Sequence, residues 1–116
     1  LYTCSLLALD AATGKMKWYF QFTHHDWHDW DAQSWPVLVD ANYQGKPRKL
    51  VFHANRNGFL YVLDRSTGQY LRSNKIIDLL DWASGIDANG RPLEIPGKNP
   101  TPEGNRICPG VQGATN

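Results

Sequence analysis

Residues 23–31 gather more groups capable of chemistry than any other part of the chain. They hold three histidines, three aspartates and two tryptophans. Histidine and carboxylate side chains both ligate metals, and His25 and His28 have a plausible ligand spacing for zinc. A zinc site needs further ligands at set positions, and the sequence contains no second cluster of this kind. A solvated loop held by hydrogen bonds, without chemistry, is a second interpretation.

The third interpretation concerns Asp31, which directly follows Trp30. A carboxylate partly shielded by an aromatic ring has its charged form disfavoured by desolvation, which makes it a better base. Calcium and other hard cations also prefer carboxylate oxygen. Asp31 is therefore a candidate for either a general base or a metal ligand.

Short β-strands must position this loop. Residues 17–23, just before it, alternate aromatic and polar side chains, as a half-buried strand does. An apolar run at residues 6–10 and a turn at Gly14 complete a predicted hairpin with this strand. Further strands are predicted at residues 36–40, 48–53 and 59–64.

An internal repeat supports this arrangement. Residues 6–14 match residues 60–68 at five of nine positions, namely two leucines, an aspartate, a threonine and a glycine. The Asp and Thr side chains are expected to bond backbone groups across the turn, which explains their fixed spacing from Gly. Four short strands per repeat are typical of a β-propeller. Because a single repeat cannot bury its own faces, we expect the chain to be part of a longer protein.

The sequence becomes less regular after Ser73. Residues 74–82 favour either a short helical turn or the end of a strand at Ile76 and Ile77. A tight turn at residues 87–92 predicts a small hairpin. Residues 96–104 are rich in Pro and Gly and are expected to form an ordered loop of the kind that often carries function.

Composition excludes several classes of partner. The net charge is +1, from 12 basic and 11 acidic residues, and no basic run is present, so nucleic acid is not an expected partner. No apolar stretch approaches the roughly 20 residues that span a bilayer. Cys4 and Cys108 fit neither a zinc spacing nor a disulfide-dense scaffold, and their pairing stays open.

Four motifs together resemble the quinoprotein alcohol dehydrogenases, a family that includes methanol and ethanol dehydrogenases. His25-Asp26 followed by Trp30-Asp31 resembles the loop that carries the catalytic aspartate of that family. Residues 53–58 resemble its strand-and-turn motif, and residues 108–116 resemble a third motif. The segment from Ala8 to Trp18 resembles the family's tryptophan-docking repeat.

The resemblance implies a fold and a cofactor. Residues 1–116 would form part of an all-β, eight-bladed propeller with tryptophan-docking repeats, roughly two blades plus a long loop. The enzyme would oxidise a primary alcohol with pyrroloquinoline quinone (PQQ). Asp31 would be the general base and a metal ligand, while Arg56 and Asn116 would contact the quinone. The remaining metal ligands and the tryptophan that stacks on the quinone would precede Leu1.

The resemblance also implies calcium rather than a lanthanide. Lanthanide-dependent relatives carry a further aspartate two residues after the catalytic one, where this chain has Gln33. A cytochrome c electron acceptor and a periplasmic location are further implications. The chain departs from the family pattern at three positions: His24 replaces a proline, Trp27 is bulkier than expected, and Arg72 stands where a second docking tryptophan would fall.

Alternatives remain for the whole chain and for single residues. A non-catalytic propeller that serves as a scaffold or binding module would share the repeats but would need neither the acidic loop nor Arg56. Arg56 could instead pair with a carboxylate in a turn, and Asn116 could be a terminal loop amide. The histidines of the loop are expected to fix its conformation rather than to ligate a metal.

Overall fold

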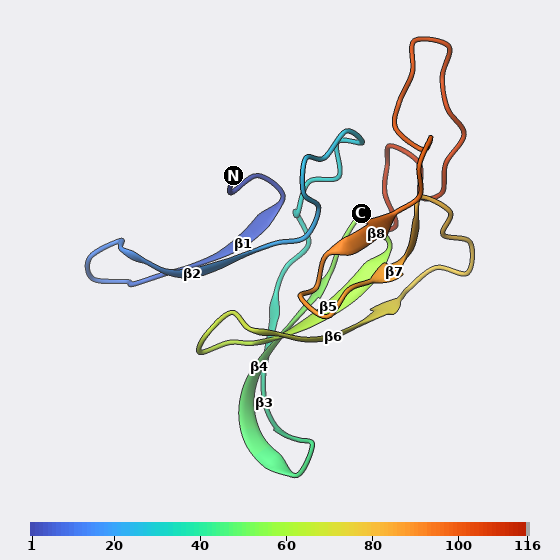
Figure 1. Ribbon diagram of the computed structural model, residues 1–116. Coiled ribbons are helices and arrows are strands. Elements are labelled where there is room, and N and C mark those ends of the chain that lie inside the picture. Colours follow the sequence, from blue (N-terminus) through green and yellow to red (C-terminus); the bar gives the residue numbers. More distant parts are fainter. Residues whose placement is uncertain (116) are drawn as a thin grey trace.

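The chain forms eight short strands that pair into three antiparallel sheets, and the computed structural model describes residues 1–115. Within these residues no helix is long and apolar enough to cross a membrane. Figure 1 shows β1–β2 and β7–β8 as separate hairpins that flank a four-stranded sheet. The strands are β1 (Ser5–Leu9), β2 (Met16–Gln21), β3 (Val37–Tyr43), β4 (Lys46–Ala54), β5 (Phe59–Asp64), β6 (Tyr70–Lys75), β7 (Ala83–Ile86) and β8 (Pro92–Glu94).

The four-stranded sheet has the order β3-β4-β5-β6. Its inner strands, β4 and β5, carry the buried side chains, including Val51 and Leu63, whereas β3 alternates exposed and half-buried residues. Gln44 and Gly45 join β3 to β4 with φ values of 51° and 77°, as the tight turn of a two-residue hairpin requires. This consecutive up-and-down order is that of a propeller blade.

The predicted repeat is confirmed as a repeat of structure. The β1–β2 hairpin corresponds to β5–β6, and each has a register shift at the same place, between Ala8 and Leu9 and between Val62 and Leu63. In both turns the Gly amide donates to the Asp carbonyl at 2.8 Å. In both, an Asp carboxylate oxygen accepts the amide two residues later, at 3.1 and 2.9 Å.

Trp18 joins the β1–β2 hairpin to the next blade. Its indole Nε1–H donates to the carbonyl oxygen of Arg65 at 3.0 Å. Its ring lies against Gly68, where a Cβ atom would come within 2.7 Å of the indole. The tryptophan-docking contact predicted for Trp18 is therefore present. Arg72, at the equivalent position of β6, is exposed and donates to Asn74 instead.

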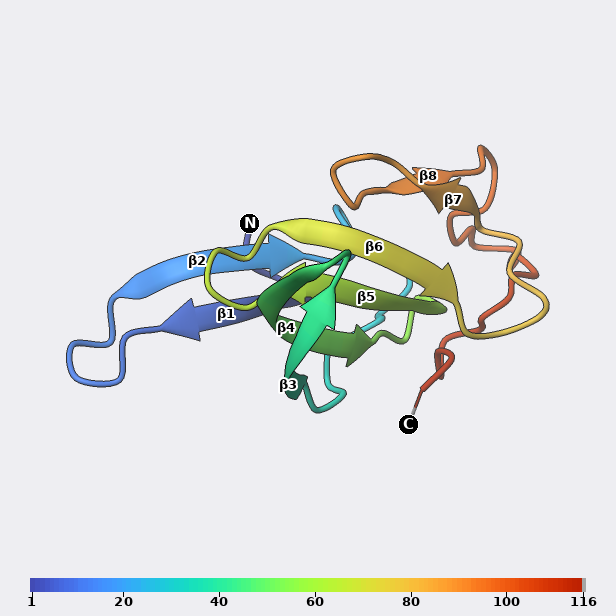
Figure 2. The same cartoon turned by 90° about the horizontal axis from the view of Figure 1, so that it is seen from below.

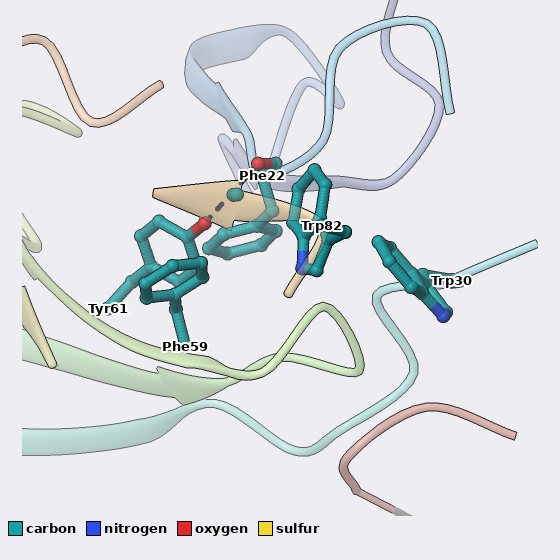
Figure 3. Packing of buried hydrophobic residues seen from close by; sticks show 6 residues of the cluster. Phe22, Trp30, Phe59, Tyr61 and Trp82 are labelled. Atoms are coloured by element: carbon teal, nitrogen blue, oxygen red, sulfur yellow. Dashed lines mark hydrogen bonds between the residues drawn. The ribbon is translucent and has the colours of Figure 1, made fainter. Parts of the chain in front are cut away.

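A cluster of aromatic side chains forms the core beside the acidic loop, as shown in Figure 3. It lies where the end of β2, strand β5 and the start of β7 meet. Its large members are Phe22, Trp30, Phe59, Tyr61 and Trp82. Figure 2 shows the hairpins on either side of the sheet from below.

The less regular part of the sequence contains strands rather than a helical turn. Strand β6 ends at Lys75, and the Ile76 amide still donates to Gly58 at 3.0 Å. The helical turn is therefore wrong, and the predicted strand end at Ile76 and Ile77 is right to within one residue. The predicted small hairpin is confirmed by the pairing of β7 with β8.

Candidate functional site

The acidic loop, residues 24–31, leaves the end of β2 and exposes its last carboxylate. Phe22 and Thr23, just before the loop, are buried, and Trp30, near its end, is fully buried. Asp31 follows directly and is exposed. His25 and Asp29 have φ values of 51° and 62°, which reverse the chain between these buried ends. The loop can therefore present the Asp31 carboxylate to a ligand while its neighbour is fixed in the core.

Trp30 is held on three sides. Its indole Nε1–H donates to the carbonyl oxygen of Gly110 at 2.9 Å. The His28 ring stacks on it with centroids 4.3 Å apart, and Trp82 meets it edge-on at 4.7 Å. Figure 3 shows Trp30 and Trp82 side by side. Such contacts restrict the segment from which Asp31 projects.

Asp26 organises the interior of the loop. One carboxylate oxygen accepts the His28 amide at 2.8 Å, and the other accepts the Trp30 amide at 2.7 Å. The Cys4 thiol lies 3.4 Å from the second oxygen. Burial raises the pKa of Cys4 to about 12, and the negative charge of Asp26 adds to this effect. The thiol is therefore a neutral donor to the Asp26 carboxylate.

The turn that carries Arg56 meets the carboxyl-terminal loop, residues 108–115. The Arg56 guanidinium donates from Nε to the carbonyl oxygen of Gln112 at 3.1 Å and from Nη2 to that of Val111 at 2.7 Å. The Ala114 amide donates back to the carbonyl oxygen of Arg56 at 2.8 Å. Gly113 permits this approach, because a Cβ atom there would come within 2.5 Å of the Arg56 side chain. These contacts are with backbone carbonyls, not with the carboxylate that the alternative interpretation required.

A polar cluster under this turn fixes its conformation. Asn57 is fully buried, and its amide nitrogen donates to the hydroxyl oxygens of Tyr61 at 2.9 Å and Thr23 at 3.1 Å. The Trp82 indole donates to the carbonyl oxygen of Asn57 at 2.8 Å. Arg56 thus projects from a turn with little freedom, and the same residue that anchors the turn also anchors the start of the acidic loop.

The structure brings the three predicted segments together. Trp30 contacts Gly110, Arg56 contacts residues 111–114, and the hydroxyls of Ser34 and Thr115 lie 3.0 Å apart. Asn116, the third predicted site residue, lies outside the described residues. The segment leading to it is in place against both Arg56 and the residues that follow Asp31.

The histidines of the loop stack on neighbouring tryptophan rings. Within residues 1–115 no three His, Cys, Asp or Glu side chains are grouped so as to hold a metal ion. His25 stacks on Trp27 with centroids 4.6 Å apart, as His28 does on Trp30. Burial lowers the pKa of both His24 and His28, which favours neutral rings. These positions favour the supporting role expected for the histidines.

The residues fit a quinone and a hard cation by the chemistry of their donors. Arg56 uses two of the five N–H donors of a guanidinium on backbone carbonyls, and the remaining ones can meet the oxygens of a quinone. Asp31 offers exposed carboxylate oxygen, the preferred ligand of calcium. Since calcium takes about six to eight oxygen ligands, Asp31 would supply only part of such a site.

Sequence reasoning missed three residues that shape the site. Asp26 had a usable signal, because Asp often bonds the amide two residues later. Asn57 also had one, since it belongs to an Asn-x-Asn-Gly turn. No sequence pattern indicates the role of Asp81, because its partners are distant in the sequence. Its carboxylate accepts the Cys108 amide at 2.7 Å and the Lys98 ammonium at 2.9 Å. These two donors lower the pKa of Asp81 and join the loop of residues 96–104 to the site.

Comparison with known proteins identifies the family of this chain. Residues 1–73 match the family model described as the β-propeller domain of glucose, ethanol and alcohol dehydrogenases that use PQQ. The quinohemoprotein alcohol dehydrogenase of Comamonas testosteroni is 39% identical over 116 residues, which are 100% of this chain and 16% of that protein. The 1-butanol dehydrogenase (cytochrome c) of Thauera butanivorans is 41% identical over 96 residues, or 83% of this chain and 14% of that protein.

Solved structures agree in fold as well as in sequence. A europium-containing methanol dehydrogenase superposes with a TM-score of 0.92 at 36% identity, over 99% of this chain and 20% of that one. The crystal structure of the Comamonas testosteroni enzyme gives a TM-score of 0.89 at 39% identity, over 100% of this chain and 17% of that one. The blade, the docked Trp18 and the matched residues together show that the chain belongs to the β-propeller family of PQQ-dependent alcohol dehydrogenases.

Proposed function

We propose that the protein to which this chain belongs oxidises a primary alcohol to an aldehyde with PQQ, and that Asp31 is the general base. The observation that carries the proposal is the placement of Asp31. Its carboxylate is exposed, while the preceding residue, Trp30, is fully buried and bonded to Gly110. A base must be both accessible to its substrate and held in place, and this arrangement provides both.

Each residue of the site has a different proposed role in this reaction. When bound, PQQ supplies the acceptor for a hydride from the alcohol carbon, and a calcium ion supplies Lewis acidity. Asp31 accepts the proton of the alcohol hydroxyl and contributes oxygen to the metal. Arg56 directs its remaining N–H donors at the quinone oxygens and stabilises negative charge that develops there. Asn116 is proposed as a further contact to the quinone.

The finer features of the whole protein are also proposals. Eight blades, a periplasmic location and a cytochrome c acceptor follow the family pattern, and the name of the Thauera butanivorans relative supports the acceptor. Gln33, two residues after Asp31, is neutral and supports calcium over a lanthanide. A europium-containing methanol dehydrogenase is nevertheless among the similar structures. Metal analysis of the intact protein distinguishes the two ions.

The substitution Asp31→Asn in the full-length protein tests the assignment of the base. The amide is nearly the same size but cannot take the hydroxyl proton. We expect the quinone to stay bound and dye-linked alcohol oxidation to fall about 100- to 10,000-fold, the range that general bases contribute. Asp29→Asn, in the same loop and with the same loss of charge, is the control and should keep its activity. Near-normal turnover of Asp31→Asn would reject the assignment.

A further inference from the structure

The three aspartates of the acidic loop do different things. Asp29 and Asp31 are exposed, whereas Asp26 is half-buried and points inward. Its two carboxylate oxygens accept the amides of His28 and Trp30 at 2.8 and 2.7 Å. Hydrogen bonds to an ionised carboxylate are shorter and stronger than bonds between neutral groups. Asp26 therefore fixes the backbone that leads into Asp31.

The Trp30 amide is the important partner, because the next residue along the chain is Asp31. With its amide bonded to Asp26, its indole bonded to Gly110 and its ring fully buried, Trp30 cannot shift without breaking several contacts. Because Asp31 is joined to Trp30 by one peptide bond, the position of Trp30 restricts the position of the Asp31 backbone. Among residues 1–115, the Trp30 backbone is restrained from inside the loop by the hydrogen bond that its amide donates to Asp26.

Cys4 supports the Asp26 carboxylate from the neighbouring chain segment. The thiol donates to the oxygen that also accepts the Trp30 amide. The Cys4 carbonyl accepts the Phe22 amide at 2.9 Å, which ties this segment to the start of the loop. Asp26 is thus held at a fixed position relative to the end of β2, and it restricts the movement of the Trp30 backbone.

We propose that Asp26 is a positioning residue for the reaction: it sets the location of the Asp31 carboxylate through the Trp30 amide and does not touch the substrate. The inference rests on the proposed role of Asp31 as the base. A purely structural turn is the competing explanation, and it predicts loss of folding rather than loss of turnover. Errors of about 1 Å in the placement of a reacting group can cost about 100-fold in rate.

The test compares Asp26→Asn with Asp29→Asn in the full-length, quinone-loaded protein. At position 26 one side-chain atom becomes an amide nitrogen, which cannot accept from either backbone N–H. We expect kcat for dye-linked alcohol oxidation to fall roughly 10- to 100-fold, with KM for the alcohol within about threefold and the quinone still bound. The Trp30 amide should exchange with deuterium faster. Asp29→Asn loses the same charge in the same loop, and it should match the parent protein in every measurement.

A double variant separates this inference from the role of Asp31. If Asp26 acts through Asp31, then Asp26→Asn should have no further effect on the residual rate of Asp31→Asn. Near-normal turnover of Asp31→Asn rejects the base itself. If Asp31→Asn is inactive while Asp26→Asn keeps the parent kcat, only the positioning role is rejected.

A second variant guards against failure to fold. In Asp26→Ser the hydroxyl can still accept the His28 amide, but the shorter side chain cannot reach the Trp30 amide as well. The same fall in kcat is therefore expected. If neither Asp26 variant can be recovered folded and loaded with quinone, the competing structural explanation is correct and the proposal is overturned.

Discussion

Arg56 serves two purposes at the scale of a single residue. Two of its N–H groups hold the carbonyls of Val111 and Gln112, and its own carbonyl accepts the Ala114 amide. The planar guanidinium makes these bonds in a fixed geometry and still has donors for a ligand. Arg56 is therefore both a bridge between two segments of the site and a candidate contact for the quinone.

Replacing Arg56 tests this double purpose. Arg56→Ala should weaken quinone binding by the apoprotein at least roughly tenfold or slow reduction of the quinone, because a charge-assisted hydrogen bond contributes about 1.5–3 kcal/mol. Arg56→Lys keeps the charge but lacks the planar fork, so its effect should be intermediate. Titration of the apoprotein with quinone and single-turnover reduction measure the two effects.

Arg72→Ala is the matched control, because Arg72 is exposed and its side chain donates to Asn74, two residues away on the same strand. It should leave both quantities unchanged. Unchanged binding and unchanged reduction in Arg56→Ala would show that Arg56 only bridges the two loops.

At the scale of the element, the repeated hairpin is the unit of construction. The Asp-x-x-Thr-Gly turn closes through bonds between residues only a few positions apart, and the same turn occurs in β1–β2 and β5–β6. The joint between blades is different, because Trp18 reaches Arg65 and Gly68 from the preceding hairpin. Strand pairing therefore builds each blade, while side-chain docking joins one blade to the next.

Gly68→Ala should disrupt this joint. Its φ of +75° disfavours any side chain, and the added Cβ would come within 2.7 Å of the Trp18 ring. Gly45→Ala is the matched control, since Gly45 has a φ of +77° and nothing within 4 Å. We expect about 1–2 kcal/mol from the backbone strain at both positions and a further 1–3 kcal/mol at Gly68 from overpacking. Urea unfolding of the full-length variants measures the difference, and equal losses would show that the docking contact does not contribute to stability.

At the scale of the whole molecule, the core depends on an imidazole that stays neutral. His53 is 2% exposed and stacks on Phe22 with centroids 4.3 Å apart. Its Nε2 lies 3.3 Å from the Asn55 amide nitrogen, and its Nδ1 has no partner among the described residues. Burial lowers the pKa of His53 to about 4. An unfolded chain would protonate this ring near pH 6.5.

This difference predicts how stability depends on pH. Between about pH 6.5 and 4 the unfolded state binds a proton that the folded state does not, so the free energy of unfolding falls as the pH falls. The loss at His53 should reach roughly 3 kcal/mol near pH 4 and vanish above about pH 7. Burial lowers the pKa of His24 and His28 as well, which adds in the same direction.

His53→Gln checks the assignment, because glutamine is neutral at every pH and can still bond Asn55. We expect a lower overall stability but a shallower slope, by about one proton, when urea unfolding is followed from pH 7 to 4. A slope identical to that of the parent protein would assign the pH dependence to other groups.

Much of the fold is local in origin and could be predicted. Five strands and the β7–β8 turn follow from aromatic or apolar alternation and from Gly turns, since these signals act within a few residues. The extent of β6 was not apparent, because the segment that includes Arg72 and Asn74 is polar and becomes a strand only by pairing with β5. Asp31 and Arg56 were identifiable by type and motif. The turns at Asp26 and Asn57 had local signals, but their contacts with Trp30, Tyr61 and Thr23 depend on the tertiary structure.

The sequence by itself determined the repeated hairpins and the acidic loop, because these depend on residue type and short-range hydrogen bonds. The resemblance of that loop to the family motif singled out Asp31 as the candidate base. Only the tertiary structure decided which distant groups meet. Trp30 finds its carbonyl partner 80 residues away at Gly110, and Arg56 finds Val111 at a separation of 55. Every residue offers a carbonyl oxygen, so no pattern in the sequence selects one of them. The selection is made by packing, which buries Trp30 against Trp82, leaves Asp31 exposed and brings the loop of residues 110–114 against both Trp30 and Arg56.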